Sequence, residues 1–203
     1  PLVLTVAASG SMSLNLLGRD ELREIEGIGG GQAGDRLTGN AGANVLRGNG
    51  GDDLLVGLDG DDRLEGGAGN DRLDGGAGVD AAEYVTAAAG VVVDLGRSGP
   101  QDTGGAGWDE LVGIENLTGS RFGDALTASP GRNVINAGEG DDIVWGSGEG
   151  DDLFLKNGAD RAFGGAGREY IEGGGGADLI HGGPGDDWLE GDYQGPWFAN
   201  GPE

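Results

Sequence analysis

A nine-residue alternation of polar and aliphatic positions runs through most of the chain. Over residues 48–80 it reads GNGGDDLLV, GLDGDDRLE, GGAGNDRLD and GGAGVD. Each phrase has glycines, then an acidic residue, then an aliphatic residue two positions later. Strand alternation places the aliphatic side chain on one face and its neighbours on the other, and the glycines allow tight turns. The pattern therefore predicts a repeated turn and short strand.

The acidic position of the phrase, here called the slot, recurs in two arrays with the same phase. The first array has Asp35, Asn44, Asp53, Asp62, Asp71 and Asp80, and the second has Asp124, Asn133, Asp142, Asp151, Asp160, Glu169, Asp178 and Asp187. The residue two positions after the slot is Leu, Ile or Val in 12 of these 14 phrases. Such regularity indicates a repeat architecture.

Two successive phrases are long enough for one coil with a strand on each side. Aliphatic residues from both sides then meet inside, and coils stack at the parallel-strand spacing of about 4.8 Å. We therefore expect an all-β fold, a parallel β-roll, in which the slots of alternate phrases lie in one column. Neighbouring phrases serve opposite edges.

The phrase GGAGNDRLD at residues 66–74 matches G-G-x-G-x-D-x-U-x at every defined position. The chain thus resembles the RTX (hemolysin-type calcium-binding) nonapeptide-repeat family over about residues 25 to 190. The resemblance implies a right-handed parallel β-roll. It also implies calcium ions between successive coils, held by the slot aspartate and by backbone carbonyls of the glycine loops.

The charge of the chain agrees with bound cations. The formal net charge is −24 and there is no cysteine, so thiolate metal sites and disulfides do not contribute. Stacked carboxylates repel one another unless a cation lies between them, and calcium accepts 6–8 oxygen ligands in flexible geometry. Adjacent slots in each column would give up to about ten calcium ions. The alternative, that these aspartates only form turns, does not require one phase across all phrases.

The candidate calcium ligands follow from this spacing. The side-chain candidates are Asp35, Asp53, Asp71, Asp62, Asp80, Asp124, Asp142, Asp160, Asp178, Asp151 and Asp187, with Asn44, Asn133 and Glu169 as weaker ones. The candidate backbone carbonyls are those of Gly48, Gly50, Gly57, Asp59, Gly66, Gly67, Ala68, Gly69, Gly138 and Gly140.

The arrays divide the chain into five parts. These are lead-in or cap strands (1–29), the first array (30–83), irregular spacer rungs with a loop (84–118), the second array (119–190) and a C-terminal cap or linker (191–203). A motif of the form D-E-L-x-x-I-E-x-[IL] precedes each array, at 20–28 and at 109–117, which indicates an internal duplication. We expect one continuous solenoid; the alternative is two rods hinged at 96–107.

The outward residues differ between the arrays. The first presents charged residues, among them Arg47 and Glu65, which we interpret as a solvated face. The second presents Trp145, Phe163 and His181 as one ladder, with Tyr170 above Trp188 on the other sheet. These aromatic faces either bind a glycan or partner protein or are covered by a neighbouring part of the protein. The strong acidity argues against a nucleic-acid partner, and no apolar run is long enough to span a membrane.

We expect a non-enzymatic, calcium-binding module of a larger, secreted or cell-surface bacterial protein. One aliphatic residue and several glycines per phrase bury little area against the entropy of ordering the chain, so calcium should be required for folding. RTX proteins typically leave the cell unfolded through a type I secretion channel. The alternatives are an adhesive or glycan-binding module and an accessory domain of a secreted enzyme. Because the sequence begins with Pro1 rather than Met, we expect it to be part of a longer protein.

Overall fold

The computed structural model describes residues 3–5, 11–13 and 27–191, and all regular structure within them is β-strand. None of these residues forms a helix that is long and apolar enough to cross a membrane. The chain forms two compact units. Unit 1 comprises residues 1–86 and 98–116, and unit 2 comprises residues 87–97 and 117–203.

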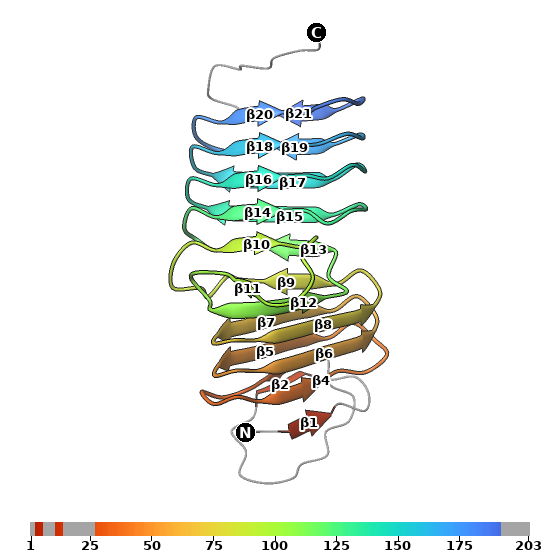
Figure 1. Ribbon diagram of the computed structural model, residues 1–203, viewed down its shortest axis with the longest axis vertical. Helices are drawn as coiled ribbons and strands as arrows, with labels where there is room; N and C mark the ends of the chain where they lie inside the picture. The colour runs from red at the N-terminus through yellow and green to blue at the C-terminus, as the bar shows by residue number, and fades with distance from the viewer. Residues whose placement is uncertain (1–2, 6–10, 14–26, 192–203) are drawn as a thin grey trace. The chain divides into compact units, whose positions relative to one another are not determined.

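Unit 1 is built from two sheets of parallel strands (Figure 1). In spatial order, one sheet has β1 (Val3–Thr5), β4 (Arg36–Thr38), β6 (Leu54–Asp59), β8 (Arg72–Ala77) and β12 (Trp108–Val112), followed by β11 (Gln101–Asp102), which pairs antiparallel with β12. The other has β2 (Ser11–Ser13), β3 (Gly27–Gly29), β5 (Val45–Gly50), β7 (Arg63–Ala68) and β9 (Ala81–Glu83).

Unit 2 repeats this arrangement with mostly shorter strands. One sheet has β10 (Val92–Asp94), β14 (Ala125–Thr127), β16 (Ile143–Trp145), β18 (Arg161–Phe163) and β20 (Leu179–His181). The other has β13 (Asn116–Thr118), β15 (Val134–Glu139), β17 (Asp152–Asn157), β19 (Tyr170–Glu172) and β21 (Trp188–Glu190). Figure 1 shows the strands of the two sheets alternating from one coil to the next.

Within each array, paired strands of successive coils are offset by two phrases, or 18 residues, as expected. In unit 1, Leu46 lies opposite Leu64 and Leu55 opposite Leu73; in unit 2, Val144 lies opposite Ala162. These aliphatic residues are fully buried and form a core one side chain thick. The structure therefore confirms the expected all-β parallel β-roll. The continuity of the two arrays as one rod stays a prediction.

The spacer is more ordered than its turn-rich sequence indicates. The spacer contributes β10 to a sheet, and the expected loop at 96–107 contains β11, which forms a small hairpin with β12. The second copy of the duplicated motif supplies β12 and the start of β13. Most of the first copy, residues 20–26, and the tail after residue 191 lie outside the described residues.

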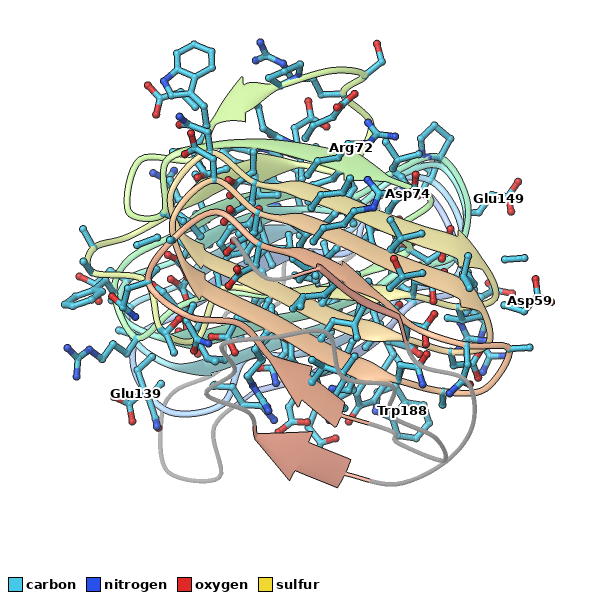
Figure 2. All side chains as sticks on the ribbon, turned by 90° about the horizontal axis from the view of Figure 1, so that it is seen from below. Asp59, Arg72, Asp74, Glu139, Glu149 and Trp188 are labelled. Carbon is cyan, nitrogen blue, oxygen red and sulfur yellow. The ribbon has the colours of Figure 1, made fainter. Side chains whose placement is uncertain are left out.

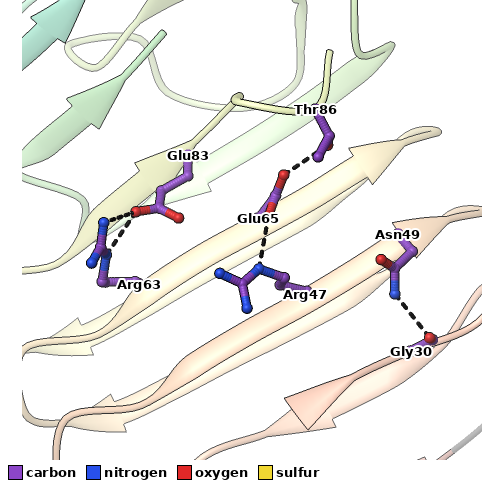
Figure 3. A network of polar contacts seen from close by, with 7 residues as sticks. All are labelled: Gly30, Arg47, Asn49, Arg63, Glu65, Glu83 and Thr86. Atoms are coloured by element: carbon purple, nitrogen blue, oxygen red, sulfur yellow. Dashed lines mark hydrogen bonds and ion pairs between the residues drawn. The ribbon is translucent and has the colours of Figure 1, made fainter. Parts of the chain in front are cut away.

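The interpretation of the first array's outer face as a solvated surface is wrong for Glu65. That side chain is buried because Arg47 and Thr86 cover its carboxylate, at 3.0 and 2.7 Å respectively (Figure 3). Beside it, the buried carboxylate of Glu83 accepts a hydrogen bond from Arg63. Charged residues of neighbouring coils thus form ion pairs across this face.

Candidate calcium sites

The slots of each column are joined by hydrogen bonds between coils. One side-chain oxygen of a slot accepts a hydrogen bond from the backbone N–H of the slot 18 residues earlier, at distances between 2.6 and 3.2 Å. Asp53 Oδ1, for example, accepts from Asp35 N, and Asp71 Oδ1 accepts from Asp53 N. These bonds fix the carboxylates at the edge of the roll and bury them; Asp80 and Asp151 have no exposed surface.

At six aspartate slots the second carboxylate oxygen has no hydrogen-bond partner, and at Glu169 neither carboxylate oxygen has one. These buried Oδ2 atoms belong to Asp53, Asp62, Asp71, Asp80, Asp142 and Asp160. A buried carboxylate oxygen without a partner loses its hydration and gains nothing in return. Such an atom indicates either a missing cation or a protonated carboxyl group.

At the first four of these slots, the unpaired oxygen lies against a glycine that has no room for a side chain. We call the residue five before a slot its first position. A Cβ added at Gly48 would fall between Asp53 Oδ2 and the Gly66 carbonyl of the next coil, and one added at Gly57 between Asp62 Oδ2 and the Gly75 carbonyl. A Cβ at Gly75 would likewise meet Asp80 Oδ2 and the Gly113 carbonyl, and one at Gly66 would meet Asp71 Oδ2. We call Asp53, Asp62, Asp71 and Asp80 the open slots.

At the remaining two, a side chain already occupies that position. The first positions of Asp142 and Asp160 are Ala137 and Leu155, and both are fully buried. We call Asp142 and Asp160 the filled slots.

A third kind of slot is satisfied by its own loop. Asp35 Oδ2 accepts from Gly31 N, Asp124 Oδ2 from Ser120 N and Asp151 Oδ2 from Ser147 N, at 2.6, 2.6 and 2.7 Å. Asn44 Oδ1 accepts from Asn40 N in the same way, at 2.7 Å. These four are the capped slots, in which a side-chain oxygen of the slot accepts the N–H of its own loop. At Asp124 and Asp151 the other oxygen also accepts a backbone N–H, from Val91 and Asn133 respectively.

The backbone conformation four residues before the slot separates the capped slots from the others. This second position has a positive φ before every open or filled slot, for example 99° at Gly67 and 113° at Gly138. It has no positive φ at Gly31, Asn40, Ser120 or Ser147. Before the open and filled slots, the loop also continues the preceding strand, so that β5, β6, β7, β8, β15 and β17 each have six residues. The N–H group of the second position then does not cap the slot.

Burial shifts the acidity of the uncapped slots in one direction. It raises the pKa of Asp71 and of Asp142 to about 7, and neighbouring carboxylates add to the shift while a backbone hydrogen bond opposes it. Burial also raises the pKa of Asp53, Asp62 and Asp160 to about 6. Without metal, the carboxyl groups of these slots therefore take up protons more readily in the folded chain than in the unfolded one.

The open slots fit calcium by donor type. Each offers a buried carboxylate oxygen, and at three of them a backbone carbonyl from the next coil lies against the same glycine. No group of three or more His, Cys, Asp or Glu side chains converges within the described part of the chain, so backbone carbonyls must supply many of the ligands. All-oxygen coordination that mixes carboxylates and carbonyls is typical of Ca²⁺.

A protein-family comparison decides the identity of the repeats. The model of the RTX calcium-binding nonapeptide repeat matches four times, at residues 29–64, 48–81, 118–154 and 163–192, which together cover more than half of the chain. The chain belongs to this family. It is a calcium-binding β-roll module, as the resemblance implied. No curated protein matches the chain.

The other predicted ligands of this RTX module lie in varied surroundings. Asp178 and Asp187 are half-buried in the last coils, and Glu169, the one longer side chain, is buried beside Asp187. Asn133 donates to Ser129 Oγ at 2.9 Å. Of the predicted carbonyls, those of Gly48, Gly57 and Gly66 lie at first positions beside a slot of the preceding coil. The Ala68 carbonyl accepts a strand hydrogen bond from Gly51 N.

The remaining predicted carbonyls belong to residues of the extended loops. Gly50, Asp59 and Gly67 lie in paired strands, as does Gly138, whereas the Gly69 and Gly140 carbonyls lie against Gly107 and Gly158 of the next coil. Not every acid of the RTX module is directed into the roll. Figure 2 shows the side chains of Asp59, Glu139 and Glu149 pointing away from the ribbon, and all three are exposed.

Two slots were missed in the sequence because they lie in the spacer, outside the nine-residue frame. Asp109 Oδ1 accepts from Asp71 N at 3.0 Å, and Glu115 Oε2 accepts from Asp80 N at 2.9 Å, so each continues a column of the first array. A signal was present, because both are followed two residues later by a buried leucine, Leu111 and Leu117. The insertion before Asp109 concealed it.

The aromatic residues of unit 2 lie in register as expected. The rings of Trp145 and Phe163 stack with centroids 6.3 Å apart, and those of Phe163 and His181 with centroids 5.4 Å apart. On the other sheet, Tyr170 lies opposite Trp188 and donates to Glu190 at 2.9 Å. The flat faces of the Trp145, Phe163 and His181 rings therefore contact one another along this ladder.

Proposed function

We propose that this RTX module is a calcium-triggered folding element of a larger secreted bacterial protein. On this proposal it is non-enzymatic, crosses the secretion channel unfolded, folds in external calcium, and then stabilises or spaces an attached domain. The observation that supports it is the set of open slots, where a buried carboxylate oxygen has no partner within a protein fold that is otherwise hydrogen-bonded.

The physical reason is that the metal-free fold is opposed by its own charge. The net charge of −24 and the buried, mutually repelling slots favour the unfolded chain at neutral pH. The core offers little compensation, because each phrase buries one aliphatic side chain while many glycines must be ordered. Calcium binding energy is then folding energy.

Circular dichroism of the metal-free chain tests this proposal. In EDTA at pH 7.5, about one unit above the raised carboxyl pKa values, we expect a spectrum typical of an unfolded chain. Titration with CaCl₂ should produce a β-spectrum, with a midpoint on the order of 10⁻⁴–10⁻³ M. Magnesium is the matched control and should not replace calcium, because it prefers strict octahedral geometry. A β-spectrum that is unchanged by EDTA would contradict the proposal.

A glycan-binding role for the aromatic ladder is less well supported. Sugars stack on exposed ring faces, but the faces of Phe163 are covered by Trp145 and His181. Trp188 is the exception, since 62% of its surface is exposed and it projects from the ribbon in Figure 2. We therefore retain adhesion only as a second candidate, centred on Trp188 and tested by calorimetry with acidic polysaccharides.

A further inference from the structure

The first positions of one column in unit 1 end in a residue that is not glycine. Leu64 lies opposite Ala82 in the pairing of β7 with β9, so Tyr84 lies where Gly66 lies one coil earlier and Gly48 two coils earlier. Gly48 serves the slot Asp53, and Gly66 serves the slot Asp71. The next slot of this column is Asp109, whose Oδ1 accepts from Asp71 N at 3.0 Å. Tyr84 is therefore the first position of Asp109.

Tyr84 places a buried ring at a position that carries no side chain at the open slots. Only 4% of its surface is exposed, and its hydroxyl group lies close enough to the Asp109 carboxylate to affect its ionisation, although outside direct hydrogen-bond geometry. Burial and then the charge of Asp109 raise the pKa of Tyr84 well above its ordinary value, so the hydroxyl keeps its proton.

A second hydroxyl group lies on the same carboxylate. Thr103, which is fully buried, has its Oγ1 3.3 Å from Asp109 Oδ2 and 2.8 Å from the carbonyl oxygen of Gly107. Asp109 itself is 1% exposed, yet its Oδ2 is not among the unpaired oxygens of the described residues. The surroundings of Asp109 therefore differ from those of Asp53 and Asp71, although all three belong to one column.

We propose that Tyr84 and Thr103 take the place of a calcium ion at Asp109. The column Asp35, Asp53, Asp71, Asp109 then ends in a slot that needs no metal. Because Asp109 accepts the N–H of Asp71, this slot holds the C-terminal side of the Asp71 site whether or not calcium is present. Tyr84 is in this sense a positioning residue. The inference rests on calcium binding at the open slots.

The decisive experiment is the number of calcium ions bound by the full chain, measured by equilibrium dialysis and elemental analysis. Tyr84→Gly vacates the first position, so this variant should bind one more ion than the wild type. The matched control is Gly57→Ala, which places a Cβ between Asp62 Oδ2 and the Gly75 carbonyl and should bind one ion fewer. An unchanged number in a Tyr84→Gly chain with a β-spectrum overturns the inference.

A second variant decides the matter if Tyr84→Gly does not fold. Tyr84→Phe keeps the ring in place and removes only the hydroxyl group. It should bind the wild-type number of ions but need about threefold more calcium to fold, because a buried carboxylate loses a nearby donor. An unchanged midpoint overturns the inference. If the wild type itself binds no calcium, the proposed function fails. If the wild type binds calcium but the Tyr84 variants do not differ from it, only the inference about Tyr84 fails.

Discussion

Asp71 in unit 1 and Asp142 in unit 2 are nearly identical slots that differ by one methyl group. Both are buried, both accept the N–H of the preceding slot at 2.8 Å, and both have an unpaired Oδ2 and a pKa raised by burial to about 7. Both follow a glycine with positive φ. The first position, however, is Gly66 for Asp71 and Ala137 for Asp142. We therefore propose that the first position, and not the acidic residue, decides whether such a slot holds a cation or a proton.

Replacing the two aspartates should give the largest difference between these sites. Asp71→Asn should lose one calcium ion and raise the calcium midpoint for folding about tenfold, which corresponds to about 1.4 kcal/mol. Asp142→Asn should keep the wild-type number of ions, because a neutral amide resembles the protonated carboxyl group. Equilibrium dialysis and a CaCl₂ titration followed by circular dichroism measure both quantities. Equal ion losses in the two variants would remove the distinction between open and filled slots.

The pH dependence of the metal-free chain should follow the raised pKa values. A carboxyl group whose pKa rises from 3.8 when unfolded to about 7 in the fold, as for Asp71 and Asp142, stabilises the fold fully below pH 3.8. That contribution is lost as the pH rises through about 7. In metal-free buffer we therefore expect β-structure to decrease between pH 5 and pH 8. In saturating calcium the open slots no longer bind protons, so the decrease should be much smaller. A metal-free spectrum that is independent of pH over this range would show that these carboxyl groups do not contribute.

Removing the methyl group should convert a filled slot into an open one. Ala137→Gly vacates the first position of Asp142, and the chain should bind one additional ion and fold at a calcium concentration about two- to threefold lower. Ala128→Gly is the matched control, because Ala128 is the first position of Asn133, which carries no charge to hold calcium. If both variants bind the wild-type number of ions, the Cβ at residue 137 does not exclude the metal.

The smallest expected effect concerns strain at an open slot. Leu58, the second position of Asp62, has a φ of 90° and is exposed. A non-glycine residue in this conformation costs about 1–2 kcal/mol. Leu58→Gly relieves this strain but costs about 0.5–1 kcal/mol in conformational entropy, so it should lower the calcium midpoint by less than about twofold. Leu58→Ala should not lower it, because alanine retains the Cβ. A midpoint raised by glycine would mean that the leucine side chain stabilises the loop by contacts.

The fold could be predicted from the sequence because every phrase repeats the same pattern of turn glycines, slot and buried aliphatic residue. The slot and the aliphatic residue two positions later set the register, and glycines mark each turn. The three kinds of slot could not be predicted in the same way. Gly31 and Gly67 are both glycines at a second position, as Asn40 and Asn49 are both asparagines, yet only Gly67 and Asn49 have a positive φ. That choice depends on whether the loop pairs with the next coil.

The spacer shows a different limit. Asp109 and Tyr84 are far apart in the chain, whereas a first position and its slot normally belong to one phrase. Their relation appears only when β12 pairs with β8 and β9 with β7. Spacing in the sequence predicts which residues are neighbours within one phrase. An insertion in a turn breaks that spacing while the strands still stack, so neighbours such as Tyr84 and Asp109 could not be predicted.

Because the hydrogen bonds between slots all run in one direction, the two ends of a stack of coils expose different polar groups. Each slot donates its N–H toward the C-terminal neighbour and offers its carboxylate to the N-terminal one. An N-terminal end thus exposes a carboxylate oxygen, which water or any cation can satisfy. A C-terminal end exposes N–H groups, which water can satisfy but no cation can. The two ends of a stack therefore differ in the ligands that they attract, and a stack of this kind can be assembled in register only with one polarity.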